Sequence, residues 1–167
     1  MDVDMVVLRL VHIVFGAFWA GAALFMAFVV IPKVQALGPA VAVPVFAALG
    51  KIVGPLLVGS GVITVAAGIT LSLRLRWNSL DAWFDTGWGW AIALGFVAAL
   101  VALTVGTRAA LLARSMAAMG AGMAGREPTP EEMGRMRSTS QRLMKLGRIG
   151  SILVLIALGT MASARFV

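Results

Sequence analysis

The side chains best suited to chemistry lie near the start of the first long apolar run. Arg9 and His12 are ionisable residues within that run, and an ionisable group inside a membrane helix is costly enough to be a functional candidate by default. The spacing i, i+3, i+4 and i+7 places four residues on one helical stripe: His12, Phe15, Gly16 and Trp19. A histidine above a glycine, with aromatic rings beside it, forms a surface on which a porphyrin can lie. The alternative interpretation is a packing histidine that hydrogen-bonds to a neighbouring helix or to interfacial water.

A short motif in this run resembles the first helix of a known superfamily. It consists of His12, Trp19-Ala20-Gly21, Phe25 and Pro32, with six residues between the histidine and the tryptophan. The pattern resembles the first-helix signature of the copper-resistance D (CopD-like) superfamily of small bacterial integral membrane proteins. It is also similar to the first helix of HemJ-type protoporphyrinogen oxidases, which carry an early histidine and a downstream tryptophan.

The resemblance implies a haem b site or a copper site on the first helix. In HemJ-type proteins the corresponding histidine is associated with haem, so the resemblance gives His12 the role of iron ligand. Gly16 and Trp19 would then line the haem pocket, and Arg9 would pair with a propionate. The CopD-like resemblance implies copper handling, with His12 as the metal ligand. The chain has one histidine, so the further histidines of both groups are missing and oxidase activity is not carried over.

Ten methionines offer a second source of copper ligands. They include two closely spaced groups, namely Met116, Met119 and Met123, and Met133 with Met136. Thioether sulfur suits Cu(I), which is a soft ion. Methionine at helical spacing also serves as packing material, and both interpretations stay open.

The composition indicates a membrane protein. Of the 167 residues, 60% are hydrophobic, and the mean hydropathy is +0.98; a soluble domain has roughly 45–50% apolar residues. The net charge of +7 would suit nucleic acid. In an apolar chain, however, Lys and Arg more often set topology against anionic lipid, so we expect membrane lipids and no nucleic acid as partners. The absence of cysteine excludes disulfides, thiolate metal sites and cysteine nucleophiles.

We predict an all-α fold, a bundle of four transmembrane helices in a single domain over residues 1–167. Four runs approach the ~20 apolar residues that a span requires, at about 5–31, 52–73, 88–112 and 147–165. Pro32 closes the first run. The proline-containing stretch 34–50 is expected to form a short interfacial helix, or else a kinked extension of the second span.

Residues 113–146 are predicted to form a polar cytoplasmic loop. Within it, Thr129-Pro130-Glu131-Glu132 has the pattern of a helix start with a capping box. We therefore expect a helical extension that runs from this point without a break into the fourth span.

Basic residues are unevenly divided between the two sides of the predicted bundle. One side receives ten Lys and Arg residues (Lys33, Lys51, Arg108, Arg114, Arg126, Arg135, Arg137, Arg142, Lys145 and Arg148), and the other receives four (Arg9, Arg74, Arg76 and Arg165). The richer side of a membrane protein faces the cytoplasm. We therefore expect a multi-pass protein of the bacterial inner membrane with both termini outside.

Two further sets of residues indicate contacts. Small residues at helix-packing spacing let backbones approach in lipid, and here they are Ala17, Gly21, Gly50, Gly54, Gly61, Gly68 and Gly95. A basic cluster before the fourth span suits anionic lipid headgroups or a partner, and consists of Arg135, Arg137, Arg142, Lys145 and Arg148.

Three classes of function are compatible with these features. We expect a non-catalytic accessory or scaffold subunit that packs with itself as a homo-oligomer or with a larger membrane complex. The alternative is a haem b- or copper-associated redox protein that uses His12. A small transporter or channel is the third class, and it is disfavoured because no Asp or Glu lies inside a predicted span to relay protons or bind a driving cation.

Overall fold

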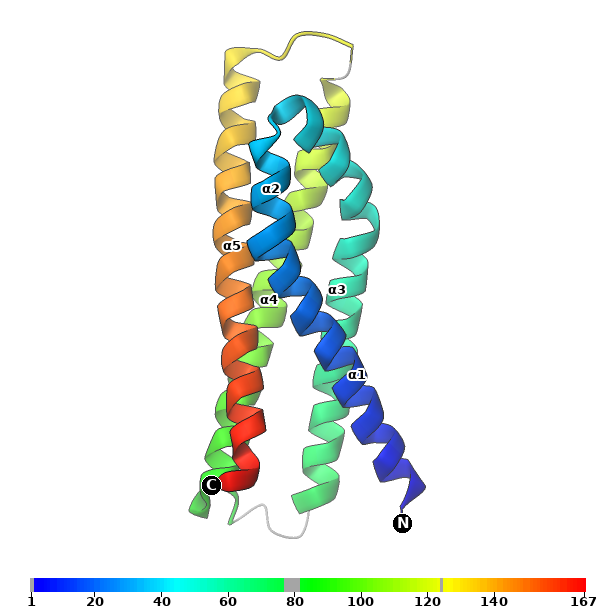
Figure 1. Ribbon diagram of the computed structural model, residues 1–167, viewed down its shortest axis with the longest axis vertical. Coiled ribbons are helices and arrows are strands. Elements are labelled where there is room, and N and C mark those ends of the chain that lie inside the picture. The colour runs from blue at the N-terminus through cyan, green and yellow to red at the C-terminus, as the bar shows by residue number, and fades with distance from the viewer. Residues whose placement is uncertain (1, 77–81, 124) are drawn as a thin grey trace.

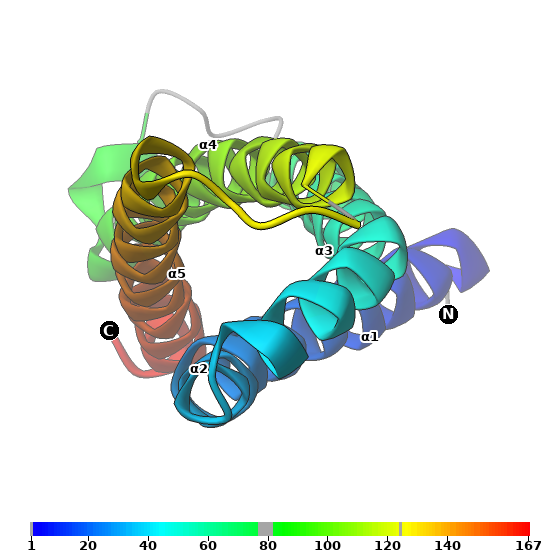
Figure 2. The same cartoon turned by 90° about the horizontal axis from the view of Figure 1, so that it is seen from above.

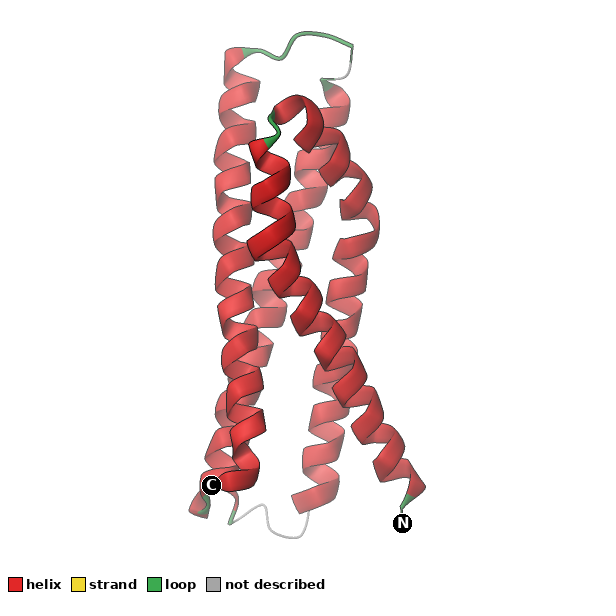
Figure 3. Cartoon of the chain, viewed as in Figure 1, coloured by secondary structure: helices red, strands yellow, loops and turns green. Residues whose placement is uncertain are grey.

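The computed structural model describes residues 2–76, 82–123 and 125–167. Within these ranges every regular element is a helix (Figure 3). The long helices are α1 (Val3–Phe25), α3 (Pro39–Arg76), α4 (Gly87–Gly122) and α5 (Pro130–Ser163). The short elements are the π-helix η1 (Met26–Val30), α2 (Ile31–Ala36), and the 3₁₀ turns η3 (Trp83–Asp85) and η4 (Ala164–Phe166). Four segments are long and apolar enough to cross a membrane, so the predicted all-α, four-helix architecture is confirmed.

The helices follow one another round a ring (Figure 2). The main contacts join α1 to α3, α3 to α4, α4 to α5, and α5 back to α1. Both termini lie at the same end of the bundle (Figure 1). We call this the terminal end, and we call the opposite end, where α4 ends and α5 begins, the loop end.

The first helix changes its neighbour along its length (Figure 1). Near the terminal end α1 packs on α3, and toward the loop end it leans across to α5. There the Ser151 hydroxyl donates a hydrogen bond to the Ala23 carbonyl at 3.2 Å. Gln35 of α2 extends the contact, because its side-chain N–H donates to the Ser140 hydroxyl at 2.8 Å. The two ends of the bundle are therefore held together by different pairs of helices.

The prediction that Pro32 closes the first helix is wrong. The backbone stays helical through Ala36, and the chain turns at Gly38, where a φ of +85° favours glycine. Directly before Pro32 the helix widens into η1, in which the Ile31 N–H bonds to the Met26 carbonyl. A proline ring inside an α-helix collides with the carbonyl four residues earlier. A wider turn at this point relieves the collision and lets the helix continue.

Of the two alternatives for the stretch 34–50, the structure has the extension of the second span and no separate interfacial helix, because α3 starts at Pro39 and continues through Pro44 and Pro55 to Arg76. Pro39 occupies the first helical position, where the missing N–H would have had no partner within the helix. The predicted loop 113–146 is mostly helical as well, because α4 continues to Gly122 and α5 starts at Pro130.

The predicted start of the last helix is confirmed. The Thr129 hydroxyl accepts a hydrogen bond from the Glu132 N–H at 3.3 Å, and the Glu132 carboxylate accepts one from the Thr129 N–H at 2.9 Å. Arg126 forms a two-pronged ion pair with the same carboxylate. The hydrogen bonds from Arg126 and from the Thr129 backbone lower the pKa of Glu132 to about 2. From this cap α5 runs unbroken to Ser163, as predicted.

Candidate functional site

The stripe of α1 that could carry chemistry faces α3. Three pairs of residues are stacked along this antiparallel contact: His12 with Gly68, Gly16 with Thr64, and Trp19 with Gly61. A methyl group on Gly68 would lie 2.9 Å from Cε1 of His12, and one on Gly61 would lie 2.9 Å from Cε2 of Trp19. Carbon atoms do not approach that closely without displacement. Each large side chain of α1 therefore occupies a notch that only glycine can leave open.

His12 is hydrogen-bonded to the backbone of the neighbouring helix. Its Nδ1 lies 2.8 Å from the Thr64 carbonyl oxygen. A carbonyl only accepts, so Nδ1 carries the proton and donates, and the lone pair of neutral imidazole is on Nε2. A carbonyl oxygen has two lone pairs, so Thr64 can accept this bond in addition to the one from its own helix. The arrangement ties α1 to α3 at half-buried depth.

The polar side chains of α3 that face this contact bond within their own helix. The Thr64 hydroxyl donates to the Ser60 carbonyl at 2.7 Å, and the Ser60 hydroxyl donates to the Leu57 carbonyl at 3.1 Å. Both residues are buried. In an apolar surrounding every such donor needs a partner, and the described residues contain no fully buried side-chain nitrogen or oxygen without one. The contact is therefore complete as a packing surface.

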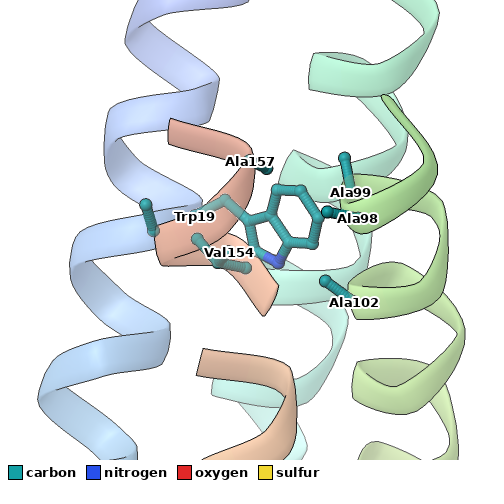
Figure 4. Packing of buried hydrophobic residues seen from close by; sticks show 7 residues of the cluster. Trp19, Ala98, Ala99, Ala102, Val154 and Ala157 are labelled. Carbon is teal, nitrogen blue, oxygen red and sulfur yellow. The ribbon is translucent and has the colours of Figure 1, made fainter. Parts of the chain in front are cut away.

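Trp19 lies at the centre of the bundle. Its side chain is 7% exposed and is surrounded by alanines of α4 and by Val154 and Ala157 of α5 (Figure 4). Ala98, Ala99 and Ala102 provide the α4 side of this cluster, and their small size leaves room for the indole. Trp19 therefore contacts α3, α4 and α5 at once. It fixes the position along the bundle at which α1 moves away from α3.

The other predicted site and packing residues divide into two groups. Gly54 faces Ala110 of α4, with 3.5 Å to its Cβ, and Gly95 faces Thr160 of α5 so closely that a methyl group would lie 2.7 Å from the hydroxyl. Arg9 is exposed and forms no ion pair with the described residues. Ala17 and Gly21 are exposed as well, and no atom lies within 4 Å of the Cβ position of Gly21 or Gly50. Gly21 and Gly50 therefore do not pack on another helix of this chain, and a packing role for them stays a prediction for contacts with another molecule.

Comparison of the chain with protein-family models, with curated proteins and with solved structures gives no match. The resemblance to CopD-like and HemJ-type proteins therefore stays a prediction from the first-helix motif.

The predicted basic cluster lies on the part of α5 that extends toward the loop end. All five of its members are exposed: Arg135, Arg137, Arg142, Lys145 and Arg148. Within the described ranges, no three His, Cys, Asp or Glu side chains come together in a way that could hold a metal ion. Because the sequence has one histidine, no second imidazole of this chain can join His12 as a ligand.

The sequence predicted the α1 stripe but not its partner, Thr64. A signal was present in the spacing. His12 and Trp19 are seven residues apart, Gly61 and Gly68 are also seven apart, and Thr64 lies between the two glycines. When the large side chains of one helix and the glycines of an antiparallel helix have the same spacing, that pattern alone indicates how the two helices align.

Proposed function

We propose that this protein is a non-catalytic accessory subunit of the membrane, which assembles with copies of itself or with a larger complex. The observation that supports this proposal is the use of the α1 stripe. His12, Gly16 and Trp19 are the residues most able to form a reactive or cofactor-binding surface, and all three are engaged with α3. A stripe engaged in this way serves to join two helices.

The haem alternative fits this face poorly. One feature is compatible with a metal ligand, because a histidine that donates Nδ1–H to a backbone carbonyl has Nε2 free, as in most metal-bound histidines. A porphyrin, however, would need the space over Gly16. That space is filled by Thr64, whose Cγ2 lies 3.2 Å from the Cβ position of Gly16. The residues of the stripe therefore do not form a haem pocket.

An absorption spectrum of the detergent-purified protein, expressed in haem-replete cells, tests the non-catalytic assignment. The expected result is no Soret band in the wild type and no change on His12→Asn, which removes the imidazole while retaining a side-chain donor. A Soret band that disappears in His12→Asn would overturn the proposal in favour of a haem protein.

Assembly can be tested with single cysteines, because the chain has none of its own. Gly21 is exposed on the lipid-facing side of α1 and has open space around it. If copies assemble through this face, Gly21→Cys forms disulfide-linked dimers in native membranes, whereas Ala102→Cys, at a buried position, does not. If assembly is with another protein, native gels of solubilised membranes show the chain in a larger complex. A monomer in both experiments would contradict the subunit role.

A further inference from the structure

The half of the bundle nearer the loop end contains a large cavity. Its volume is about 1100 Å³, and residues from all four spans line it. Pockets that hold drug-sized ligands have volumes of roughly 300–1,000 Å³, so this cavity has room for a large guest. Trp19 and Val154 lie at its inner end, and Arg137 and Pro130 lie toward the loop end.

The cavity exists because many inward residues are small. Beyond Trp19 the inner faces of the helices present alanine and glycine where a closed bundle would present leucine. The small lining residues include Ala23, Ala27, Gly50, Gly106, Ala113 and Gly147. Neither Gly50 nor Gly106 has an atom within 4 Å of its Cβ position, so each faces open space.

Away from the loop end, the lining of the cavity is apolar. It includes Phe46, Leu57 and Leu103, together with flexible methionines such as Met116 and Met144. A water molecule needs two to four polar partners, and this lining offers few. The guest is therefore apolar over most of its length.

The loop end of the cavity differs from the rest because it is polar and basic. Gln35 and Ser140 bond to each other there, and Arg137 lines the cavity while being exposed and forming no ion pair with the described residues. Glu127 is the acidic residue of the lining. The exposed part of α5 near this end is mostly basic, with Arg135, Arg137, Arg142 and Lys145 against Glu131, and Glu132 is paired with Arg126. The mouth is therefore suited to an anionic group.

We propose that this cavity binds one anionic phospholipid, with its phosphate beside Arg137 and an acyl chain between the helices. Arg137 and Val154 are 17 positions apart on α5, which corresponds to about 25 Å at ~1.5 Å per residue. Half of a bilayer hydrocarbon core is about 15 Å thick, so one acyl chain fits within this length. Methionine side chains adapt to guests of irregular shape, which suits the mixed acyl chains of a membrane.

A phospholipid is favoured over a helix of a partner protein because of the way the lining is divided. At one end it has a basic side chain, Arg137, that is unpaired among the described residues, and along most of the rest it has apolar side chains, which matches the two parts of such a lipid. The lipid site is independent of the proposed subunit role, because a monomer and an assembled subunit would both contain it.

Native mass spectrometry of the full chain in mild detergent tests the site, with dioleoyl-phosphatidylglycerol and dioleoyl-phosphatidylcholine as probes. The wild type is expected to retain one phosphatidylglycerol, with a preference of roughly fivefold over phosphatidylcholine, as expected for one Arg near an anionic lipid. Arg137→Gln should abolish the preference. Arg135→Gln, two positions earlier on a different face of the same helix, exposed and outside the lining, should preserve it.

Two matched pairs of glycine substitutions locate the bound lipid. Gly50→Leu with Gly106→Leu fills the cavity and should weaken retention by roughly tenfold or more, as when an apolar pocket loses the space for several methylenes. Gly59→Leu with Gly159→Leu uses glycines of α3 and α5 that also face open space but do not line the cavity, and should leave retention unchanged. No retained lipid in the wild type, equal loss in both pairs, or an unchanged preference in Arg137→Gln would overturn the proposal.

Discussion

Trp19 of α1 lies in the notch left by Gly61 of α3, so that a methyl group on the glycine would come within 2.9 Å of the indole. The same methyl group would lie 2.9 Å from Cδ1 of Leu103 on α4. The absence of a side chain on Gly61 therefore allows α1, α3 and α4 to pack this closely. In lipid, where apolar burial gives little preference for helix contact, such close packing carries much of the stability of a bundle.

Gly61→Ala is therefore expected to destabilise the bundle. The added methyl group overpacks the contact and should cost about 1–3 kcal/mol. The measurement is unfolding of the detergent-solubilised protein by sodium dodecyl sulfate. Gly59→Ala is the control, since its Cβ position is open and alanine is the better helix former. Trp19→Phe should recover part of the loss when combined with Gly61→Ala, and purely additive effects in this double mutant would show that the two residues do not compete for space.

His12 is expected to exist as the tautomer with its proton on Nδ1. The chain has one histidine, so its imidazole nitrogens give one unambiguous pair of ¹⁵N NMR signals. Gly68→Ala should shift the Nδ1 signal, because the new methyl group would lie 3.1 Å from Nδ1 and push the ring away from the Thr64 carbonyl. Gly59→Ala should leave it unchanged. His12→Leu should cost about 0.6–1.7 kcal/mol, the range of hydrogen bonds between membrane helices. A proton on Nε2 would contradict the geometry.

The sequence predicted well those features that depend on a few neighbouring residues. The start of α5 is an example, because Thr129 and Glu132 satisfy each other's backbone groups whatever the rest of the chain does. The four spans were also predictable, since each depends on a continuous run of apolar side chains.

Helix ends and helix partners were harder to predict. Proline does not reliably end a helix in this chain, because a wider turn accommodates Pro32 and because Pro44 and Pro55 lie inside α3. Residues 113–122 continue α4 although Arg114 interrupts the apolar run. A charged side chain limits the part of a helix that can lie in lipid, but it does not end the helix itself. The contact between His12 and Gly68 joins positions on two helices, and neither helix alone indicates the alignment.

The cap of α5 should respond to pH through Glu132. Its pKa is lowered to about 2 from an ordinary value of 4.5, so the unfolded helix start binds a proton more readily than the folded one. The contribution of Glu132 to stability is then fully present above pH 4.5 and is lost as the pH falls toward 2. Amide hydrogen exchange at residues 131–133, corrected for intrinsic rates, should accelerate over that window.

Two variants test whether Glu132 is the group responsible for this pH response. Glu132→Gln should remove it, whereas Glu131→Gln, which changes an exposed acid outside the ion pair with Arg126, should leave it in place. Thr129→Ala should weaken the cap by about 1 kcal/mol at every pH. Equal acceleration in Glu132→Gln and the wild type would show that another group titrates.

The orientation of the bundle follows from the ten-to-four division of basic residues and is a prediction for labelling in cells. Because the native chain has no cysteine, Asp85→Cys at the terminal end and Ser138→Cys at the loop end each introduce a single thiol, and both positions are exposed. In cells with a permeabilised outer membrane, an impermeant maleimide should label Asp85→Cys. It should reach Ser138→Cys only after the inner membrane is opened, because we expect the basic side chains around that residue to face the cytoplasm. The reverse pattern would place both termini inside, and labelling of both positions in unopened cells would contradict an arrangement in which the four helices span the membrane.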